Sequence, residues 1–347
     1  MNSPPANHDG SFWGCGRKLE PRLLSPFRSL LDSKANRAIE GVGLAHLAGD
    51  VGQFLFDNDR AVVQTVDVVL PLPLEPEIWG QVAALHCLSD IYASGAKALS
   101  AVGIVGVGSK AAERNLDLVA RAYSSAVIAL NDEGVALVGG HSMWDDNNKI
   151  GFAIVGMGAQ HELRTTSGAV PGDRIFLTKP IGFGAVIAAS VNSAEATDLA
   201  EIERWMMISN RKAGDVCTLA GVKCASDVTG FGLLGTVLHI ASDSDVTVQI
   251  DMAAVPLVSG ARASIGAGTI STLSEAVWFG QSEFVDSTGT LEDHLLLVDP
   301  EVSGGLLVCV SSRTVGQFET AAAVAGLNYW EVGSVFKPCR GSMAVVR

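Results

Sequence analysis

The ten residues from Ser226 to Gly235 read SDVTGFGLLG, and from Gly230 onward they match the spacing GxGxxG of a dinucleotide-binding turn. A dinucleotide fold needs an apolar strand that runs directly into the first glycine. Here the preceding residues are CASDVT, which place Asp227 close to where the pyrophosphate would lie. A carboxylate repels phosphate unless a metal ion lies between them. The stretch therefore argues against a dinucleotide fold and for a loop, ahead of a helix, that meets phosphate through a metal.

Three further aspartates occupy positions that local structure alone does not favour. Asp67 interrupts the apolar strand VVQTVDVVL, Asp90 lies on a helix that is apolar on nearly every side, and Asp50 follows a glycine. A buried carboxylate is costly without a cation or a hydrogen-bond donor. Taken singly, Asp50 is also explained as a turn former and Asp227 as a helix cap. Together the four predict a Mg²⁺ cluster, because hard cations take carboxylate oxygens and bridge them to phosphates.

Two other glycine-rich stretches bear on phosphate binding. GIVGVGSK, Gly103 to Lys110, has the glycine spacing of a Walker A loop, but its lysine and hydroxyl come in the wrong order to meet phosphate and Mg²⁺, so we reject that assignment. In GGHSMWDD, Gly139 to Asp146, the glycines allow backbone N–H groups to approach a phosphate, and His141 and Ser142 can donate hydrogen bonds. An ordinary strand-end turn with a solvent-facing histidine explains GGHS equally well.

The composition bounds the class of protein. A chain of 347 residues with 48% hydrophobic residues normally forms two domains with well-formed cores. The formal net charge of -13 argues against nucleic-acid partners and against an anionic membrane surface, but it permits a nucleotide bound as its Mg²⁺ complex. No apolar run approaches the ~18 residues that a membrane span needs, and the polar start MNSPPANHDG shows no secretory signal.

Cysteine usage indicates the redox compartment. The chain has six cysteines and no CxxC pair, which favours reduced thiols in the cytoplasm over a disulfide frame or a zinc site. The six are Cys15, Cys87, Cys217, Cys224, Cys309 and Cys339.

Patterns along the chain predict an α+β protein of two domains. Residues 1–45 are punctuated by glycine, proline and charge, and we expect a mobile arm that a ligand orders. The turn-rich segment 161–173 separates a domain over 46–160 from a domain over 170–347. In the first domain the patterns predict a strand at 61–70, helices at 78–95 and 116–130, and a strand at 135–138. In the second they predict a helix at 204–219, a helix from 233, and strands at 174–178, 246–251, 295–298, 305–310 and 343–346.

One cysteine lies in an unusual setting within the arm. The stretch FWGCGRKLEP, Phe12 to Pro21, places Cys15 between two glycines and ahead of Arg17 and Lys18. A nearby cation stabilises the thiolate, which is the reactive form of cysteine. A lone cysteine in a mobile arm often has no function. A reactive role for Cys15 is therefore supported only if other parts of the chain indicate the same chemistry.

Taken together, these stretches resemble selenophosphate synthetase (selenide, water dikinase), of the aminoimidazole ribonucleotide synthetase-like superfamily. GCGRKLEP is similar to the family's N-terminal GC-x-x-K segment. The stretches TVD, LSDIYASG, GGHS, TKPIGFG, SDVTGFGLLG and DPEVSGGLL (299–307) follow in the family's order, and the last two are the most specific. The resemblance extends from Gly14 to the C-terminus.

The resemblance implies a fold, a reaction and partners. The fold is the two-domain α+β fold of that superfamily, and the N-terminal sheets of two protomers pair into a barrel in a homodimer. The reaction converts selenide, ATP and water into selenophosphate, AMP and phosphate. Mg²⁺ is the metal cofactor and ATP a substrate, and a monovalent cation is a further ion that the sequence leaves open.

The resemblance also implies roles for individual residues. Cys15 and Lys18 act at the chemistry, and Asp50, Asp90 and Asp227 hold Mg²⁺. The residues implied to contact the nucleotide are Lys18, Gly49, Asp67, Asp90, Gly140, His141 and Ser142, the last three as candidates for a contribution from the partner subunit.

The chain also departs from the family pattern. Val51 replaces a second aspartate, His86 replaces an asparagine, and Thr272 to Ala276 reads TLSEA where GT-x-x-N is expected. Two alternatives therefore stay open: another ATP-dependent kinase or synthetase of the superfamily, and a non-catalytic nucleotide-binding paralogue. The pair Cys15 and Lys18 favours the selenium enzyme, and the four retained aspartates disfavour a non-catalytic protein.

Overall fold

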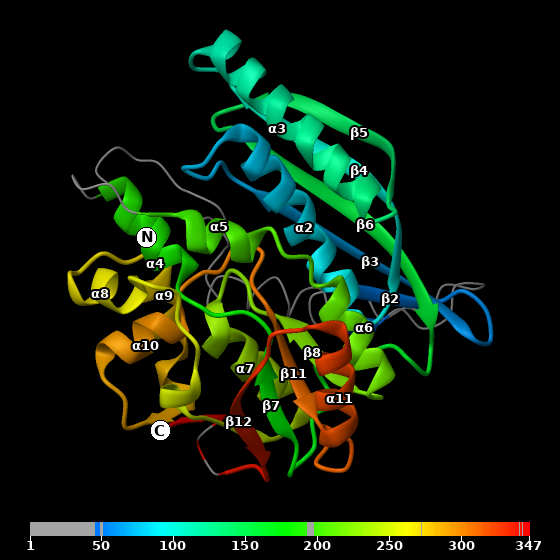
Figure 1. The fold of residues 1–347 in the computed structure, drawn as a ribbon, viewed down its shortest axis with the longest axis vertical. Coiled ribbons are helices and arrows are strands. Elements are labelled where there is room, and N and C mark those ends of the chain that lie inside the picture. Colours follow the sequence, from blue (N-terminus) through cyan, green and yellow to red (C-terminus); the bar gives the residue numbers. More distant parts are fainter. Residues whose placement is uncertain (1–45, 49–50, 193–197, 272, 340, 342) are drawn as a thin grey trace.

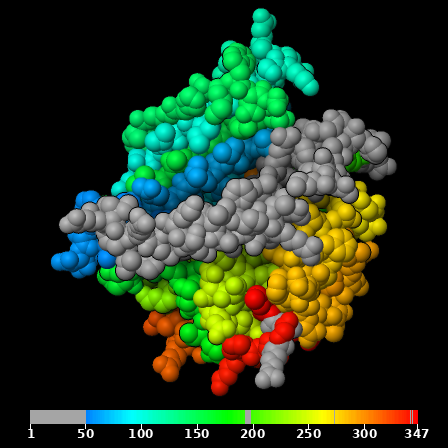
Figure 2. All heavy atoms as spheres, turned by 180° about the vertical axis from the view of Figure 1, so that it is seen from behind, coloured from blue at the N-terminus to red at the C-terminus, as the bar shows by residue number. Residues whose placement is uncertain are grey.

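Two β-sheets, one from each half of the chain, organise the fold (Figure 1). The computed structural model describes residues 46–48, 51–192, 198–271, 273–339, 341 and 343–347. Seen from behind, the blue residues of the first half lie in one lobe and the yellow to red residues of the second half lie in the other (Figure 2). No helix among the described residues is long and apolar enough to cross a bilayer.

The first sheet has the strand order β1-β2-β3-β6-β4-β5 in the described part of the chain. Its neighbours are antiparallel, except that β4 and β5 run parallel. The strands are β1 (His46–Ala48), β2 (Val51–Leu55), β3 (Arg60–Val69), β4 (Lys97–Gly108), β5 (Ala136–Asp145) and β6 (Lys149–Ala159).

Strand β3 shows how the sequence assigns the two faces of this sheet. Successive side chains of a strand point to opposite faces. Val63 and Val69 are buried beneath the helices, whereas Val66 and Val68 are 57% and 37% exposed on the other face. Asp67 has the same parity as Val63 and Val69, so the sequence period places this carboxylate on the helix side of the sheet.

Two helices cover that inner face, α2 (Pro76–Ser94) and α3 (Ala112–Asp132) (Figure 1). Helix α2 begins with a proline in its first turn and ends at Gly95, whose φ of 82° is readily adopted only by glycine. A Cβ at Gly80 would lie 1.8 Å from the carbonyl oxygen of Ala122, so glycine permits the close approach of the two helices. Most of α2 is buried because it is enclosed by the first sheet, α3 and elements of the second half.

The second sheet has the order β10-β13-β9-β12-β7-β11-β8 in the described residues. Its strands are β7 (Arg174–Leu177), β8 (Cys224–Asp227), β9 (Thr247–Ile250), β10 (Val285–Ser287), β11 (Leu306–Val310), β12 (Trp330–Phe336) and β13 (Ala344–Val346). Helices pack on both of its faces. The helices described in this half are α4 (Phe183–Asn192), α5 (Ala200–Met206), α6 (Arg211–Leu219), α7 (Gly232–Ser244), α8 (Ala261–Gly266), α9 (Ser274–Gln281), α10 (Leu291–Leu297) and α11 (Val315–Ala325), with 3₁₀ turns η1 (Met252–Ala254) and η2 (Ser282–Phe284).

Strand β11 is apolar throughout because both faces of the second sheet are covered. Leu306 and Val308 pack with Phe318 of α11, whereas Leu307 and Cys309 pack on the side of α7. Strand β8 forms the edge of the sheet and pairs antiparallel with β11. This pairing confirms that GFGLLG is not a dinucleotide turn, since such a turn follows a strand of a parallel sheet.

Most predicted elements are confirmed, and two are wrong. The expected strand at 295–298 is helix α10, which begins with a capping box between Thr290 and Asp293. The expected single helix at 204–219 is α5 and α6, separated at the buried Asn210. The sequence patterns did not predict strands β1, β2, β4, β6, β8, β10 and β12. The Walker-like GIVGVG lies inside β4, which confirms that it is not a phosphate loop.

The stretch DPEVSGG is a buried loop that caps helix α4. Glu301 accepts hydrogen bonds from the backbone N–H groups of Gly182 (2.6 Å) and Phe183 (3.0 Å), and Asp299 accepts one from Ala185 (2.7 Å). Burial raises the pKa of Asp299 to about 7. Burial, and next the charge of Asp299, raise the pKa of Glu301 well above its usual range. The pair therefore holds protons in the folded protein that an unfolded chain releases.

These raised pKa values predict a pH-dependent stability. Because the folded state binds more protons than the unfolded state, the contribution of Glu301 is present at acid pH and is lost as the pH rises through its folded pKa. We expect the melting temperature of wild type, relative to Glu301→Gln, to fall by several degrees between about pH 5 and about pH 7.5. Calorimetry of both proteins across this range tests the expectation, and a difference that does not change with pH would contradict it.

Candidate functional site

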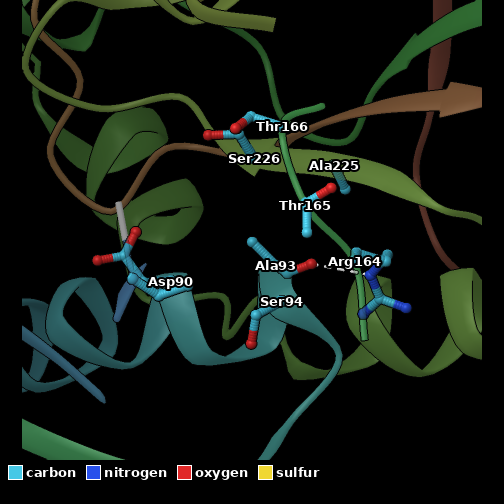
Figure 3. A pocket seen from close by; sticks show the side chains of 9 residues that line it. Asp90, Ala93, Ser94, Arg164, Thr165, Thr166, Ala225 and Ser226 are labelled. Carbon is cyan, nitrogen blue, oxygen red and sulfur yellow. Dashed lines mark hydrogen bonds between the residues drawn. The ribbon is translucent and has the colours of Figure 1, made fainter. Parts of the chain in front are cut away.

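A small pocket lies where the C-terminal half of α2 meets the end of strand β8 (Figure 3). Its space of about 20 Å³ holds about one water molecule, so a nucleotide would have to lie outside it. Four segments meet here, from β2, from α2, from the connection between the two sheets and from β8. The lining residues are Val51, Asp90, Ala93, Ser94, Arg164, Thr165, Thr166, Ala225 and Ser226.

Asp90 supplies the carboxylate of this pocket. It lies on α2, is 6% exposed, and accepts a hydrogen bond of 2.6 Å from the Thr65 hydroxyl of β3. Figure 3 shows Asp90 on the same helix as Ala93 and Ser94, with its carboxylate directed away from the helix. The position of Asp90 agrees with the expected apolar helix, since the neighbouring turns of α2 are buried.

Asp67 lies two residues beyond Thr65 on the same face of β3. The Cys87 thiol donates to the Asp67 carbonyl oxygen (3.3 Å), and Nε2 of His86 lies 3.7 Å from Asp67 Oδ2. His86 is fully buried, and its Nδ1 accepts a hydrogen bond of 3.0 Å from the backbone N–H of Ser303. Asp67 and Asp90 therefore both lie at the contact of β3 with α2.

Asp227 comes from the other half of the chain. It ends β8, is 4% exposed, and directly follows Ser226 of the pocket. The alternative role as a helix cap is wrong, because α7 begins at Gly232 with Phe231 at the N-cap. Burial lowers the pKa of the nearby Lys179 to about 7, and the Asp227 charge opposes that shift. The pocket thus adjoins carboxylates from both halves.

The donor chemistry of these residues fits a hard cation. Carboxylate oxygens are the ligands that Mg²⁺ prefers, and Asp90 and Asp227 lie on two elements, α2 and β8, that contact each other. Among the described residues, no three His, Cys, Asp or Glu side chains are grouped closely enough to hold a metal ion. Asp50 lies outside the described residues, and its sequence neighbour Val51 lines the pocket. The convergence of Asp50, Asp90 and Asp227 stays a prediction.

The GGHS stretch lies away from these carboxylates within one protomer. Gly140, His141 and Ser142 are exposed on β5, the edge strand of the first sheet. Two strands separate β5 from β3, so the stretch is about 14 Å from Asp67 across the sheet. The register places His141 in one row with Val68, on the face opposite to Asp67.

Four candidate residues lie outside the described residues: Cys15, Lys18, Gly49 and Asp50. The expected arm over residues 1–45 and Thr272 of the TLSEA stretch also lie outside them. Their assignments stay predictions that rest on the sequence.

Arg164 was not predicted from the sequence, although it lines the pocket. It is 1% exposed, and its guanidinium donates to the carbonyl oxygens of Tyr92 (2.8 Å), Ala93 (2.8 Å) and Gly214 (3.1 Å). Burial lowers its pKa. A cation on the last carbonyls of a helix is favourable, so Arg164 fixes the end of α2 that carries Asp90. No local pattern in the segment HELRTT signals this contact, because its partners are distant in sequence.

Comparisons with known proteins identify the family. Residues 48–159 match the model of AIR synthase related protein, N-terminal domain, and residues 170–346 match that of the C-terminal domain. The chain is 32% identical to selenide, water dikinase of Pseudomonas aeruginosa, over 96% of this chain and 95% of that protein. It is also 32% identical to selenide, water dikinase of Clostridioides difficile, over 86% of each chain.

A solved structure supports the fold independently. AaThiL complexed with AMPPCP and TMP is 16% identical and has a TM-score of 0.67, over 95% of this chain and 96% of that one. At this identity the likeness concerns the fold alone. The two matched domains and the identity over nearly the full length lead to one conclusion: the chain belongs to the selenide, water dikinase family of AIR synthase related proteins and has their two-domain α+β fold.

Proposed function

We propose that this protein is a phosphotransferase that makes selenophosphate from selenide, ATP and water, with AMP and phosphate as co-products. The observation that carries the proposal is the meeting of Asp90 and the end of β8, which bears Asp227, at one buried pocket in a chain that is 32% identical to a selenide, water dikinase. Buried carboxylates at such a junction are suited to hold a cation, and a nucleotide brings one as its Mg²⁺ complex.

We infer that ATP binds outside the small pocket, with its phosphates toward the carboxylates. Asp50, Asp90 and Asp227 would hold Mg²⁺, and Gly49 and Asp67 would contact the nucleotide. Bound Mg²⁺ would neutralise the charge of the phosphates. This protein is acidic and has no Walker lysine that could do so.

The chain's own residues prepare this site before any ligand binds. The Thr65 hydroxyl fixes one oxygen of Asp90, and Arg164 fixes the last turn of the same helix. A carboxylate held in this way loses less conformational freedom when it binds a cation. We propose that Lys18 and Cys15 act in the reaction itself. Lys18 would be a cation that contacts the phosphates, and Cys15 would be a thiolate that meets or guides selenium.

A homodimer would bring the GGHS stretch to a nucleotide. The face of the first sheet opposite the helices exposes Val66 (57%), Val68 (37%) and Val102 (43%), and an apolar sheet face of this kind marks an interaction surface. We propose that two such sheets pair into a barrel, with Gly140, His141 and Ser142 of one protomer at the nucleotide of its partner. We also propose a dimerising domain over 46–160 and a second domain over 170–347.

We further propose that the protein works in the cytoplasm. Among the described residues, Cys87, Cys217, Cys224, Cys309 and Cys339 are all thiols, as expected for a reducing compartment.

The proposed reaction is tested by its products. Under anaerobic conditions, the purified protein with Mg²⁺ and ATP should release AMP and phosphate, and phosphorus NMR should detect selenophosphate only when selenide is present. Selenide-independent ADP formation, or ADP formation that needs thiamine monophosphate, would favour another kinase of the superfamily. The absence of turnover with intact nucleotide binding would favour a non-catalytic paralogue.

A further inference from the structure

Ser303 lies at the centre of a buried junction between the two halves. Its φ of 52° is in the left-handed region, which is unfavourable for a residue with a Cβ. Every polar group of this residue is bonded: its N–H donates to His86 Nδ1 (3.0 Å), its carbonyl accepts from Lys179 Nζ (2.7 Å), and its hydroxyl donates to the Met206 carbonyl (2.7 Å). A strained backbone persists where surrounding contacts determine it this fully.

The hydrogen bond from Ser303 determines the tautomer of His86. A neutral imidazole has one acceptor nitrogen and one donor nitrogen. Since Nδ1 accepts from the Ser303 N–H, the ring proton is on Nε2. Nε2 is the atom that faces Asp67 Oδ2 at 3.7 Å. This distance is longer than a direct hydrogen bond, but it is short enough for the ring to act on the carboxylate as an oriented N–H dipole or through one water.

A second link joins the same loop to α2 one turn further along. Asn210 donates from Nδ2 to the Gly304 carbonyl (2.8 Å) and to the Ser89 hydroxyl (2.8 Å). Ser89 directly precedes Asp90. The loop therefore holds α2 directly at His86 and, through Asn210, at Ser89, the residue before Asp90.

We propose that His86 is a positioning residue for the metal–nucleotide site: it takes its orientation from the Ser303 loop of the second half and uses its Nε2–H to orient the Asp67 carboxylate of the first. The inference rests on the proposed function, because it assumes that Asp67 meets the metal–nucleotide complex. Groups that orient ligands in this way typically change metal affinity by about 10–100-fold when they are removed.

Two conservative variants separate the two ends of the imidazole. His86→Asn places an amide oxygen near Nδ1, so it keeps the acceptor for Ser303 and loses the group that faces Asp67. His86→Gln places an amide N–H near Nε2, so it keeps the donor toward Asp67 and loses the acceptor for Ser303. His294→Gln is the matched control, because this buried histidine stacks on Trp278 and bonds Ser287 away from the site.

The readouts are binding of Mn²⁺ together with the ATP analogue AMPPCP, followed by electron paramagnetic resonance, and the melting temperature. We expect His86→Asn to keep its melting temperature and to bind Mn²⁺–AMPPCP at least about tenfold more weakly. We expect His86→Gln to melt several degrees lower and to bind within about twofold of wild type. His294→Gln should lower the melting temperature and leave binding unchanged.

A purely structural histidine could not give this result, in which one variant loses binding but not stability and the other loses stability but not binding. Binding of wild-type strength in His86→Asn, or an equal loss in both variants, would overturn the positioning role. If His86→Gln does not fold, His86→Asn decides alone by the same criterion. Wild-type protein that fails to bind Mn²⁺–AMPPCP overturns the proposed function itself, and the inference with it, which distinguishes that result from the failure of the inference alone.

Discussion

The Asp90→Asn variant is expected to lose ATP turnover by about 10²–10³-fold while it keeps its fold. Asparagine has the same shape, and its amide oxygen can still accept the hydrogen bond from Thr65 that Asp90 accepts at 2.6 Å. The variant lacks only the charge that a Mg²⁺ ion needs from this position. Because Asp90 is buried, removing its charge also removes a desolvation cost, so the melting temperature should stay level or rise.

Product release and calorimetry together check this expectation. Asp173→Asn provides a matched control, since Asp173 is equally buried but accepts its hydrogen bond from Val170 in the connection before β7. It should change stability and leave turnover unchanged. Normal turnover in Asp90→Asn would remove Asp90 from the metal site, and a melting temperature far below that of wild type would make the loss of activity a folding effect.

Cys15→Ser is expected to abolish selenophosphate formation and to leave the affinity for Mg²⁺–ATP nearly intact. A serine hydroxyl is not ionised at neutral pH, so it cannot replace a thiolate that meets or guides selenium. Lys18→Ala should instead impair both nucleotide binding and turnover, because the lysine is a flexible cation that follows the phosphate charge. Calorimetric titration with nucleotide and phosphorus NMR of the products measure the two effects separately.

Cys339→Ser is the control for this pair, because Cys339 is an exposed thiol near the C-terminus. It should change neither binding nor turnover. Full selenide-dependent activity in Cys15→Ser would show that the stretch FWGCGRKLEP takes no part in the chemistry. The proposal would then pass to another ATP-dependent enzyme of the superfamily.

Elements with a clear hydrophobic period could be predicted from the sequence. Strand β3 and helices α2 and α3 have runs of apolar residues bounded by proline and glycine, and their positions are confirmed. Glycine-rich strands could not be predicted in this way. Strand β4 contains three glycines that imitate a loop, and contacts to the neighbouring β5 and β6 decide its conformation.

The strand expected at 295–298 failed for a different reason. Four apolar residues fit a buried strand and a buried helix equally well, and only a local signal can separate them. That signal was present in the sequence TLED, where Thr290 and Asp293 form the capping box that starts α10. Reading the polar residues before the run would have predicted the helix.

For the site, the sequence indicates residue types but not the contacts between them. The sequence singled out Asp67 and Asp90 because aspartate is unusual on an apolar strand and an apolar helix. In the structure, Asp67 on β3 is bonded by a residue of α2, and Asp90 on α2 is bonded by a residue of β3. His86 and Ser303 are 217 residues apart in the sequence. The carbonyl oxygens that accept hydrogen bonds from Arg164 lie on α2 and α6. Such contacts follow from how the two halves pack, which no local pattern encodes.

The junction at Ser303 has a thermodynamic consequence for the whole molecule. The core beneath α2 is continuous with Phe183 and Val186 of α4 and with Val302, so the two halves share one hydrophobic interior. If either half opened alone, it would expose this interior and break the hydrogen bonds that Ser303 makes with His86 and Lys179. We therefore expect the two sheets to unfold as one cooperative unit.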